Sequence, residues 1–440
     1  MSMRQFLSFL LLALALSMSV FSQTAEDLSD AWDKHHISTI FPSDVRHADL
    51  KKYLEKLKGL GVKVDQVGFS NASREIYQAE WGTGPLKVMM WSQMHGDEPT
   101  ATSSLIDMFA FLQTHKDKDW VKKLGETMTI RAVPMLNPDG AELYQRRNLQ
   151  GIDINRDAVD LRTPEARLLK QLRDNWSPAI GFNLHNQQAL TTVGPTRRQA
   201  SISFLVVYGD AAKTTNDGHE RNKRLTAAMV SALQKFIPGH IGRYGDEWTP
   251  SAFGDNFSAW GTPTILIETG ALHGKDELYL VKMNFIAFLT ALNSIATGSE
   301  KTQDPFLYIN LPENTSGGLV NLIFRGATIV NTGEMTQMLL GDIAAVTERR
   351  RASFLNMTKI RGVGDMRNLS GLEEYDASGF YVVQRFGRTK SGEMAEFFFY
   401  KKDRVIDWTS PELEKQFPPD AVYSAGKWAK GDKLVPRRRP

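Results

Sequence analysis

The sequence of 440 residues contains no cysteine. This absence excludes disulfide bonds, a lipid-modified N-terminal cysteine and thiolate metal ligands. An excess of one charge is missing too, because 53 Lys and Arg residues face 50 Asp and Glu residues, which gives a formal net charge of +3. Such a balance does not support a protein that binds nucleic acid through bulk charge. Repeats and low-complexity stretches are also absent, and the length favours more than one domain.

Long apolar runs are scarce, and the one at the N-terminus predicts export. Arg4 precedes an apolar run over residues 6–20, and Val20 and Ser22 occupy positions −3 and −1 of a cleavage site. A positive residue followed by a run of about 15 apolar positions is typical of a secretory signal peptide, whereas a membrane span needs about 20. We therefore expect a signal peptide over residues 1–22 and a periplasmic or secreted mature protein. No later segment is expected to span a membrane.

Residues 23–297 are expected to form an α/β domain. Short apolar runs bounded by turn residues alternate with segments of helical spacing, and residues 23–40 look like a helical lead-in. Alternation of this kind predicts a mixed, mostly parallel sheet flanked by helices. The clearest strand patterns cover residues 86–91, 127–133, 179–185, 204–208 and 264–270.

The pattern changes after residue 297. Residues 298–303 are polar and are expected to be a linker, and residues 304–440 read as a β-rich accessory domain. The last histidine is His273, so the accessory domain has none and the chemistry is expected upstream. The segments 322–330, 341–343 and 376–383 resemble the β-sandwich that flanks amidohydrolase barrels, although the remaining residues could not hold such a barrel.

Two segments of the α/β domain carry candidate metal ligands at the ends of predicted strands. His95 and Glu98 lie in a loop directly after one strand, and His185 ends another. The ends of strands in α/β sheets are common places for sites, and two histidines with one glutamate are a catalytic zinc ligand set with a fourth position left open. An isolated His-x-x-Glu pair is more often structural. The other motifs therefore decide the interpretation.

Four further motifs follow in a fixed order. They are Asn-Pro-Asp-Gly at 137–140, Arg-Arg-Asn at 146–148, Gly-Ile-Asp-Ile-Asn-Arg at 151–156, and a strand that ends with Glu268. Together with the two ligand segments, this order resembles the zinc carboxypeptidase family over about residues 40–297. The ordered set is specific, although each piece alone is not.

The resemblance implies a role for each matching residue. His95, Glu98 and His185 would bind one Zn²⁺, Glu268 would be the general base, Arg146 would stabilise the oxyanion, Asn155 and Arg156 would grip the terminal carboxylate, and Asp153 would orient His95. These roles suit the residue types, since a carboxylate can move protons and an arginine fork binds a carboxylate through two parallel hydrogen bonds. Arg147 is adjacent to Arg146 and could take its place.

Two further residues have open assignments. Tyr244 is the nearest candidate for the family's mobile capping tyrosine, but a partly buried structural tyrosine is the favoured interpretation. Asp255 could favour a basic C-terminal side chain by charge pairing, or it could cap a local turn, and the turn is favoured.

The expected function is that of an exported zinc metallocarboxypeptidase acting on a peptide with a free carboxylate. The interval between the second and third ligands is shorter than in the digestive carboxypeptidases. In this respect the chain is similar to murein-peptide amidases and N-acyl-amino-acid deacylases. A murein-peptide or acyl-amino-acid substrate at the same zinc site is therefore the alternative. A binding protein without turnover would be expected to lack a ligand or the base, and all four are present.

Overall fold

A computed structural model describes residues 23–332, 338–349, 356–431 and 434–437. The chain divides into two compact units. The first comprises the chain up to Ala189 with Arg198–Asn314, and the second comprises Leu190–Arg197 with the chain from Thr315 onward. The predicted signal peptide and its cleavage site lie outside the described residues.

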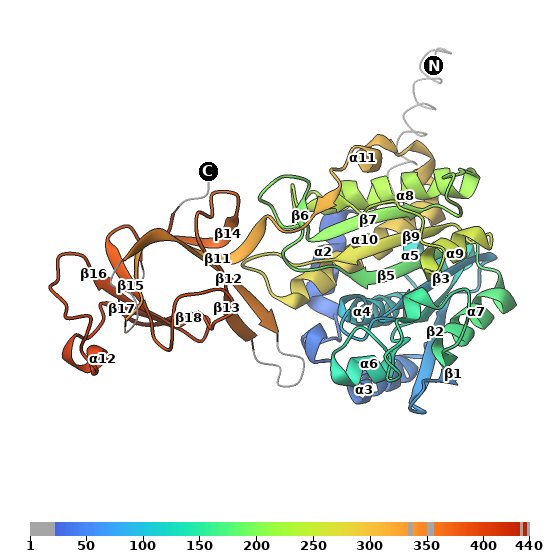
Figure 1. The fold of residues 1–440 in the computed structure, drawn as a ribbon. Coiled ribbons are helices and arrows are strands. Elements are labelled where there is room, and N and C mark those ends of the chain that lie inside the picture. Colours follow the sequence, from blue (N-terminus) through green and yellow to red (C-terminus); the bar gives the residue numbers. More distant parts are fainter. Residues whose placement is uncertain (1–22, 333–337, 350–355, 432–433, 438–440) are drawn as a thin grey trace, which may run out of the picture. The chain divides into compact units, whose positions relative to one another are not determined.

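The first unit is built on a mixed eight-stranded sheet with the order β1-β2-β4-β3-β5-β9-β7-β8 (Figure 1). Its centre is parallel, since β3 pairs in parallel with both β4 and β5, and β5 pairs in parallel with β9. This confirms the predicted fold class. The strands are β1 (Lys63–Phe69), β2 (Glu75–Trp81), β3 (Leu86–Ser92), β4 (Met128–Val133), β5 (Ile180–Asn186), β7 (Ile202–Val207), β8 (Ile241–Arg243) and β9 (Thr264–Thr269).

Helices cover both faces of this sheet. On one face Val88 and Met90 of β3 join the larger core, to which α2, α3, α4, α5, α8 and α10 contribute. On the other face Met89 and Trp91 pack with α7 and α9. The helices are α2 (Ala25–His35), α3 (His47–Leu60), α4 (Thr100–Thr114), α5 (Asp119–Thr127), α6 (Pro138–Leu143), α7 (Pro164–Trp176), α8 (Asp217–Leu233), α9 (Phe253–Ala259), α10 (Glu277–Thr297) and α11 (Phe306–Ile309). Short 3₁₀ turns are η1 (Pro42–Asp44), η2 (Ile154–Arg156) and η3 (Ser299–Thr302).

Helix α10 corrects the expectation that no later segment could span a membrane. Its 21 residues are long and apolar enough by length and composition, and 67% of its most apolar stretch is buried inside the protein. Phe285, Phe288 and Leu289 of this helix belong to the core of the first unit. Its apolar character is therefore that of a core helix that packs against several neighbours.

The segment before the sheet is a helical lead-in, as expected. Helix α2 begins with a capping box at Thr24 and Asp27. The segment is held by one buried carboxylate of α4, because Asp107 accepts hydrogen bonds from Trp32 Nε1 at 2.9 Å and from Ser38 Oγ at 2.6 Å. Residues 23–40 are thus part of the folded unit.

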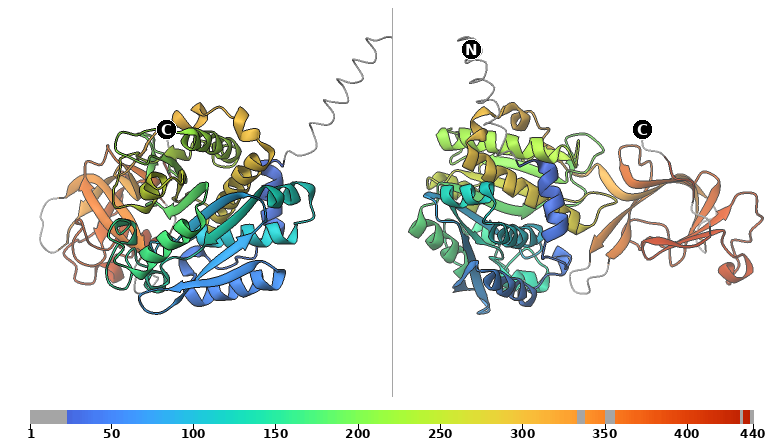
Figure 2. Two further views of the ribbon diagram at one scale, coloured as in Figure 1. Left: turned by 90° about the vertical axis from the view of Figure 1, so that its right-hand side faces the viewer. Right: turned by 180° about the vertical axis from the view of Figure 1, so that it is seen from behind.

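The second unit is β-rich, as predicted. One sheet has the order β13-β12-β11-β15-β16-β17-β18, with β14 paired to β11. Figure 2 shows this unit in orange and red from two further sides. The sheet curls, because Trp428 of β18 contacts Phe324 of β11 and Tyr375 of β14 with ring centroids 5.8 and 5.1 Å apart. The strands are β11 (Leu319–Val330), β12 (Leu339–Arg349), β13 (Asn356–Gly364), β14 (Ser370–Asp376), β15 (Phe380–Gln384), β16 (Phe397–Lys401), β17 (Ala421–Ser424) and β18 (Lys427–Gly431). A short helix, α12 (Leu413–Gln416), precedes β17, and the short strands β6 (Thr192–Val193) and β10 (Asn314–Thr315) pair with each other.

A largely buried arginine joins three strands of the second unit. Arg325 donates from Nε and Nη2 to both oxygens of Glu374 at 2.9 and 3.1 Å, and from Nη1 to Asp342 at 2.8 Å. The backbone oxygens of Met366 and Leu369 accept its remaining two N–H groups, each at 2.8 Å. All five donors of the guanidinium are therefore used.

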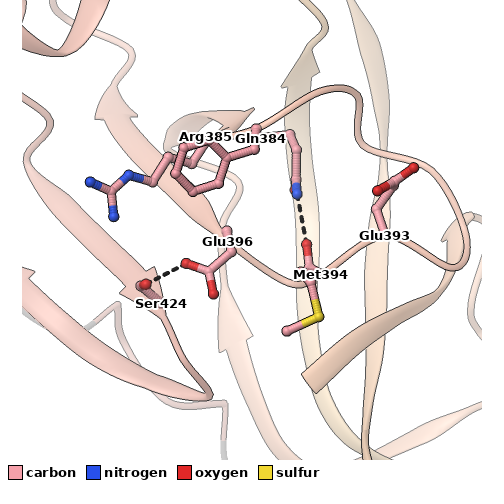
Figure 3. A pocket seen from close by; sticks show the side chains of 7 residues that line it. Gln384, Arg385, Glu393, Met394, Glu396 and Ser424 are labelled. Carbon is pink, nitrogen blue, oxygen red and sulfur yellow. Dashed lines mark hydrogen bonds between the residues drawn. The ribbon is translucent and has the colours of Figure 1, made fainter. Parts of the chain in front are cut away.

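The second unit also has a pocket of about 400 Å³ beside β15 and β17 (Figure 3). Gln384 lines it and donates from Nε2 to the backbone oxygen of Met394 at 2.6 Å. Glu396 accepts a hydrogen bond from the hydroxyl of Ser424. Two pairs of lining residues, Gln384 with Met394 and Glu396 with Ser424, are thus hydrogen bonded to each other.

Candidate active site

The candidate site lies where three parallel strands end. Ser92, the last residue of β3, pairs with Leu184 of β5, and His185 pairs with Glu268 of β9. Because neighbouring parallel strands have their carboxyl ends at one edge, the loop after β3, His185 and Glu268 meet there. The sheet therefore brings together residues that are 173 positions apart at the extremes, from His95 to Glu268.

His95, Glu98 and His185 form a buried cluster that could hold a metal ion. Glu98 lies between the histidines, with its two oxygens 2.8 Å from His95 Nδ1 and 2.6 Å from His185 Nδ1. The two Nδ1 atoms are 3.1 Å apart. The two Nδ1 atoms and the carboxylate of Glu98, which can each bind a metal ion through a lone pair, thus face one another.

This geometry fits zinc. Ligand atoms about 2.0–2.1 Å from a tetrahedral zinc ion lie roughly 3.3 Å from each other, close to the spacing in the cluster. Two imidazoles and one carboxylate are also a donor set that zinc prefers in catalytic sites. The predicted ligand set is thus assembled by the fold.

The loop that carries His95 and Glu98 is positioned by the Asn-Pro-Asp-Gly motif. A Cβ atom on Gly96 would lie 2.0 Å from the carbonyl carbon of Gly140, so the two backbones touch and only glycine fits. Asn137 Nδ2 donates to the backbone oxygen of Met94 at 3.2 Å, which fixes the chain just before His95. The role of this motif in the sequence pattern is therefore structural support.

Asp153 and Arg146 extend the cluster. Asp153 Oδ1 lies 3.0 Å from His95 Nε2, so this carboxylate orients the imidazole through the nitrogen that faces away from Glu98. Arg146 donates to Asp153 Oδ2 at 3.0 Å and to Glu98 Oε1 at 3.2 Å. Arg147 instead donates to the backbone oxygen of Gly151. Of the two adjacent arginines, Arg146 is the one that reaches the ligands.

The charges in this cluster shift its pKa values. Burial opposes protonation of His95, but the charge of Glu98 and the hydrogen bond to Asp153 outweigh it and raise the pKa of His95 to about 9. Burial likewise opposes ionisation of Asp153, yet His95 and Arg146 hold its pKa well below the ordinary value. Burial also opposes ionisation of Glu98, but the charges of His95 and His185 hold its pKa well below the ordinary value, so both carboxylates stay ionised beside the histidines.

Glu268 differs from these carboxylates. Burial and the negative charge of Glu98 raise its pKa well above the ordinary value, while the positive charge of Arg146 opposes the shift only in part. A carboxyl whose pKa is raised in this way holds a proton more tightly than an ordinary glutamate, as a group that moves protons requires.

Tyr244 lies near enough to Glu268 to feel its charge. The charge of Glu268 and burial raise the pKa of Tyr244 to about 12, and the charges of Arg146 and Arg156 act in the opposite direction. The ring is 36% exposed, so it is not a core residue.

Asn155 and Arg156 are the last two residues of the 3₁₀ turn η2. Asn155 Oδ1 accepts the backbone N–H of Phe253 at 2.8 Å, which joins η2 to the start of α9. Arg156 is exposed, and its Nη1 donates to the backbone oxygen of Asn155 at 2.7 Å. Its positive charge also lowers the pKa of Tyr244.

Asp255 makes the turn contact that the sequence favoured. Its Oδ1 accepts the backbone N–H of Thr249 at 2.8 Å. Burial raises the pKa of Asp255 to about 6, against the opposing effect of that hydrogen bond and the charge of Arg156. The carboxyl is therefore close to Arg156, so the turn contact does not exclude a role in binding.

Two asparagines of the site were missed by sequence reasoning. Asn186 donates its backbone N–H to Glu98 Oε2 at 3.1 Å and binds Thr100 through its side chain at 2.7 Å. Asn183 lies on β5 two residues before His185 and is buried. The period of two along the strand would have placed Asn183 on the face of His185.

The fold and the site define an α/β domain with a candidate metal centre of two histidines and one glutamate. Residues 50–237 match the family model described as zinc carboxypeptidase. This part of the chain is therefore similar to the zinc carboxypeptidase family. It contains all three candidate ligands, Asp153 and Arg146.

Curated relatives match a shorter segment. A protein of Trichophyton verrucosum named "Probable carboxypeptidase 2" is 34% identical over 113 residues, which cover 25% of this chain and 21% of the relative. Carboxypeptidase SOL1 of Arabidopsis thaliana is 31% identical over 93 residues, 18% of this chain and 19% of the relative. The chain thus spans about a fifth of the length of these relatives.

Solved structures of similar fold include two bacterial enzymes. A metallo-carboxypeptidase from Burkholderia cenocepacia has a TM-score of 0.47 and 16% identity, covering 57% of this chain and 69% of that one. A metallo-carboxypeptidase from Pseudomonas aeruginosa has a TM-score of 0.46 and 17% identity, with coverage of 57% and 69%.

Proposed function

We propose that the chain is an exported zinc metallocarboxypeptidase that hydrolyses the C-terminal amide bond of peptides. The observation that carries this proposal is the convergence of His95, Glu98 and His185 at one point, with Glu268 beside His185 in the sheet. The family match over residues 50–237 supports the same activity.

His95, Glu98 and His185 would hold the zinc ion through Nδ1, a carboxylate oxygen and Nδ1. When bound, zinc supplies Lewis acidity, which polarises a carbonyl group and lowers the pKa of water towards 7. Asp153 keeps the His95 ring in place through Nε2.

Glu268 supplies the proton transfers. Its buried carboxylate accepts a proton from the attacking water and then gives that proton to the leaving amine nitrogen. Its raised pKa suits this role, because the group holds the proton more tightly than an ordinary glutamate between the two steps.

Cationic groups around Glu268 would bind the substrate's negative charges. Arg146 stands against the ligand cluster, where a positive charge stabilises an oxyanion. Asn155 and Arg156 would bind the terminal carboxylate, for which a guanidinium fork offers two parallel hydrogen bonds. Tyr244 lies close to Glu268 and would cover the bound residue.

Export belongs to the proposal through the N-terminal sequence. The apolar run over residues 6–20 and the small residue Ser22 support cleavage after Ser22. N-terminal sequencing of the protein recovered from the periplasm or the medium tests this, and the expected first residue is Gln23. A mature protein that starts at Met1 would contradict it.

The activity is tested with purified, zinc-loaded protein and a mixed peptide library in two versions, with free and with amidated C-termini. Mass spectrometry follows the products. Removal of single residues from the free set only, lost in Glu268→Gln, is the expected result. Cleavage of neither set would contradict the carboxypeptidase, and murein peptides and acyl-amino acids would then be tested at the same site.

A further inference from the structure

The pocket of about 400 Å³ in the second unit is formed by three parts of its sheet (Figure 3). Gln384 is the last residue of β15, the loop 385–396 follows it, and Ser424 is the last residue of β17. The volume lies within the range of about 300–1,000 Å³ that is typical of small-molecule sites. All lining residues belong to the second unit, so the pocket is a site apart from the metal ligands of the first.

Hydrogen bonds hold two acidic walls of this pocket in place. Glu393 lies on a loop that is bound to β13, because the backbone N–H of Ile360 donates to the carbonyl oxygen of Glu393 at 2.8 Å. The carboxylate of Glu396 accepts from the hydroxyl of Ser424 and, at 2.9 Å, from the backbone N–H of Ala425. A site that is already ordered loses little conformational entropy when a ligand binds.

One acceptor that lines the pocket has no donor. Gln384 is 5% exposed, and its Nε2 donates to the backbone oxygen of Met394 at 2.6 Å, as Figure 3 shows. This contact fixes which end of the amide is the oxygen, and that oxygen, Oε1, has no hydrogen-bond partner among the described residues. A buried carbonyl oxygen without a donor costs free energy, so a ligand that supplies an N–H or O–H group would remove this cost.

The next two residues of the chain add a cation and an aromatic ring. The guanidinium of Arg385 has Glu414 as its ion-pair partner, but the two lie 3.8 Å apart, which is beyond hydrogen-bond distance. Arg385 also lies over the rings of Phe386 and Phe398, 5.2 and 5.5 Å from their centroids. Phe386 itself is 66% exposed. A donor group and an exposed ring therefore line the same pocket as the unmet acceptor.

This combination restricts the chemistry of a ligand. The ligand must carry both donors and acceptors, since Gln384 Oε1 needs a donor and the guanidinium of Arg385 can supply several. It must also present an apolar face to the ring of Phe386. The lining charges are mixed, with Arg385 set against Glu393 and Glu396, which favours a neutral ligand. A sugar ring meets all three conditions, because its hydroxyl groups donate and accept and its C–H groups form an apolar face.

We propose that the second unit binds a neutral saccharide in this pocket. Sugar hydroxyl groups would donate to Gln384 Oε1 and accept from Arg385, and the C–H face of the ring would lie against Phe386. The inference goes beyond the proposed peptidase activity and does not rest on it, because none of these residues belongs to the first unit.

The test measures binding of three neutral tetrasaccharides to the purified full-length protein by isothermal titration calorimetry. The probes are chitotetraose, cellotetraose and maltotetraose, which differ in the acetamido group and in the linkage and so show which class of glycan fits. Saturable binding of at least one probe, with one site per chain, is expected. The Kd should be the same with and without a zinc chelator, because the pocket holds none of the metal ligands.

Three variants test the residues that carry the proposal. Phe386→Ala removes the exposed ring, and Arg385→Met removes the donors but keeps the carbon chain; each should raise the Kd about tenfold and leave the Tm unchanged. Gln384→Met should raise the Kd by a similar factor, and its Tm is measured as well because it loses the hydrogen bond to Met394. Phe306→Ala alters a phenylalanine of α11 that is 58% exposed and is the matched control, with no change in Kd expected.

Absence of binding for all three tetrasaccharides at millimolar concentration would overturn the inference. A Kd that is unchanged in both Phe386→Ala and Arg385→Met would place the bound sugar elsewhere and would overturn it too, as would binding that is lost on chelation. A protein that binds a tetrasaccharide in this pocket but cleaves no peptide would support the inference while the proposed function fails.

Discussion

The two units each bury a cluster of charged side chains, and the clusters differ in how their atoms are satisfied. In the second unit Arg325 lies between Asp342 and Glu374 and uses every N–H group that it has. In the first unit Glu98 lies between His95 and His185, with the two Nδ1 atoms 3.1 Å apart. One cluster is complete by itself, whereas the other presents converging lone pairs.

This difference separates a structural cluster from a candidate functional one. A buried ion pair is favourable only when its remaining hydrogen-bonding capacity is met, which the Arg325 cluster achieves. A metal ligand set needs the reverse, since its atoms must remain available to an ion. Beside this ligand set, burial and the charge of Glu98 raise the pKa of Glu268, which suits a group that moves protons.

Substitution of the general base should have the largest effect. Glu268→Gln removes the proton acceptor and should lower kcat by about 10²–10⁴-fold. Zinc content, measured by metal analysis, should remain at one ion per chain because none of the three ligands is changed. Glu55→Gln alters an exposed glutamate paired with Lys58 and is the control. Full activity in Glu268→Gln would remove Glu268 from the mechanism.

Removal of zinc should affect the two units unequally. A ligand that binds only the folded state at a thousand times its Kd stabilises it by about 4 kcal/mol. Chelation should therefore abolish activity and lower the Tm of the first unit, and added zinc should restore both. Calorimetry that shows no shift in any transition on chelation would contradict the metal site.

Substitution of Arg325 should destabilise the second unit without changing the catalytic activity. Arg325→Met leaves Asp342 and Glu374 without their cation and should lower the free energy of unfolding of the second unit by about 3 kcal/mol. Urea denaturation measures this effect. The activity of the folded protein should be unchanged. A loss of kcat as large as that of Glu268→Gln would contradict a purely structural role for the Arg325 cluster.

The smallest expected effect concerns Asp255 and pH. Burial raises the pKa of Asp255 to about 6, and Arg156 is the cation that opposes this shift. As pH rises through about 6 the carboxyl loses its proton, so the preference for C-terminal lysine over norleucine should grow a few-fold. Asp255→Asn should flatten that pH profile. A profile that is the same in both proteins would contradict this role.

Much of the site could be predicted because its residues follow strand ends in a specific order. His95, Glu98, His185 and Glu268 are polar residues that come directly after or at the end of apolar runs, and parallel strands bring such ends together. Asn183 was missed because it lies inside an apolar strand, where a single asparagine gives no local signal. That its side-chain oxygen lacks a hydrogen-bond partner among the described residues can be seen only in the folded structure.

The fold class was also predictable, but two features were not. Helix α10 is apolar nearly all round because several helices and the sheet surround it, and composition alone cannot tell such a helix from a membrane span. Residues 190–197 fall within the first unit's stretch of sequence but belong to the second unit. Grouping of that kind depends on long-range pairing, which leaves no periodic pattern.

The attachment of α2 has a consequence for the order of events during synthesis. This helix is among the first parts of the mature chain to be made, but it docks on α4 through Asp107 and on α10 through the ion pair between Asp33 and Lys282, whose Oδ2 and Nζ lie 2.6 Å apart. Those partners follow about 70 and 250 residues later. Helix α2 therefore cannot dock until most of the first unit has been synthesised, so its docking is a late step in folding.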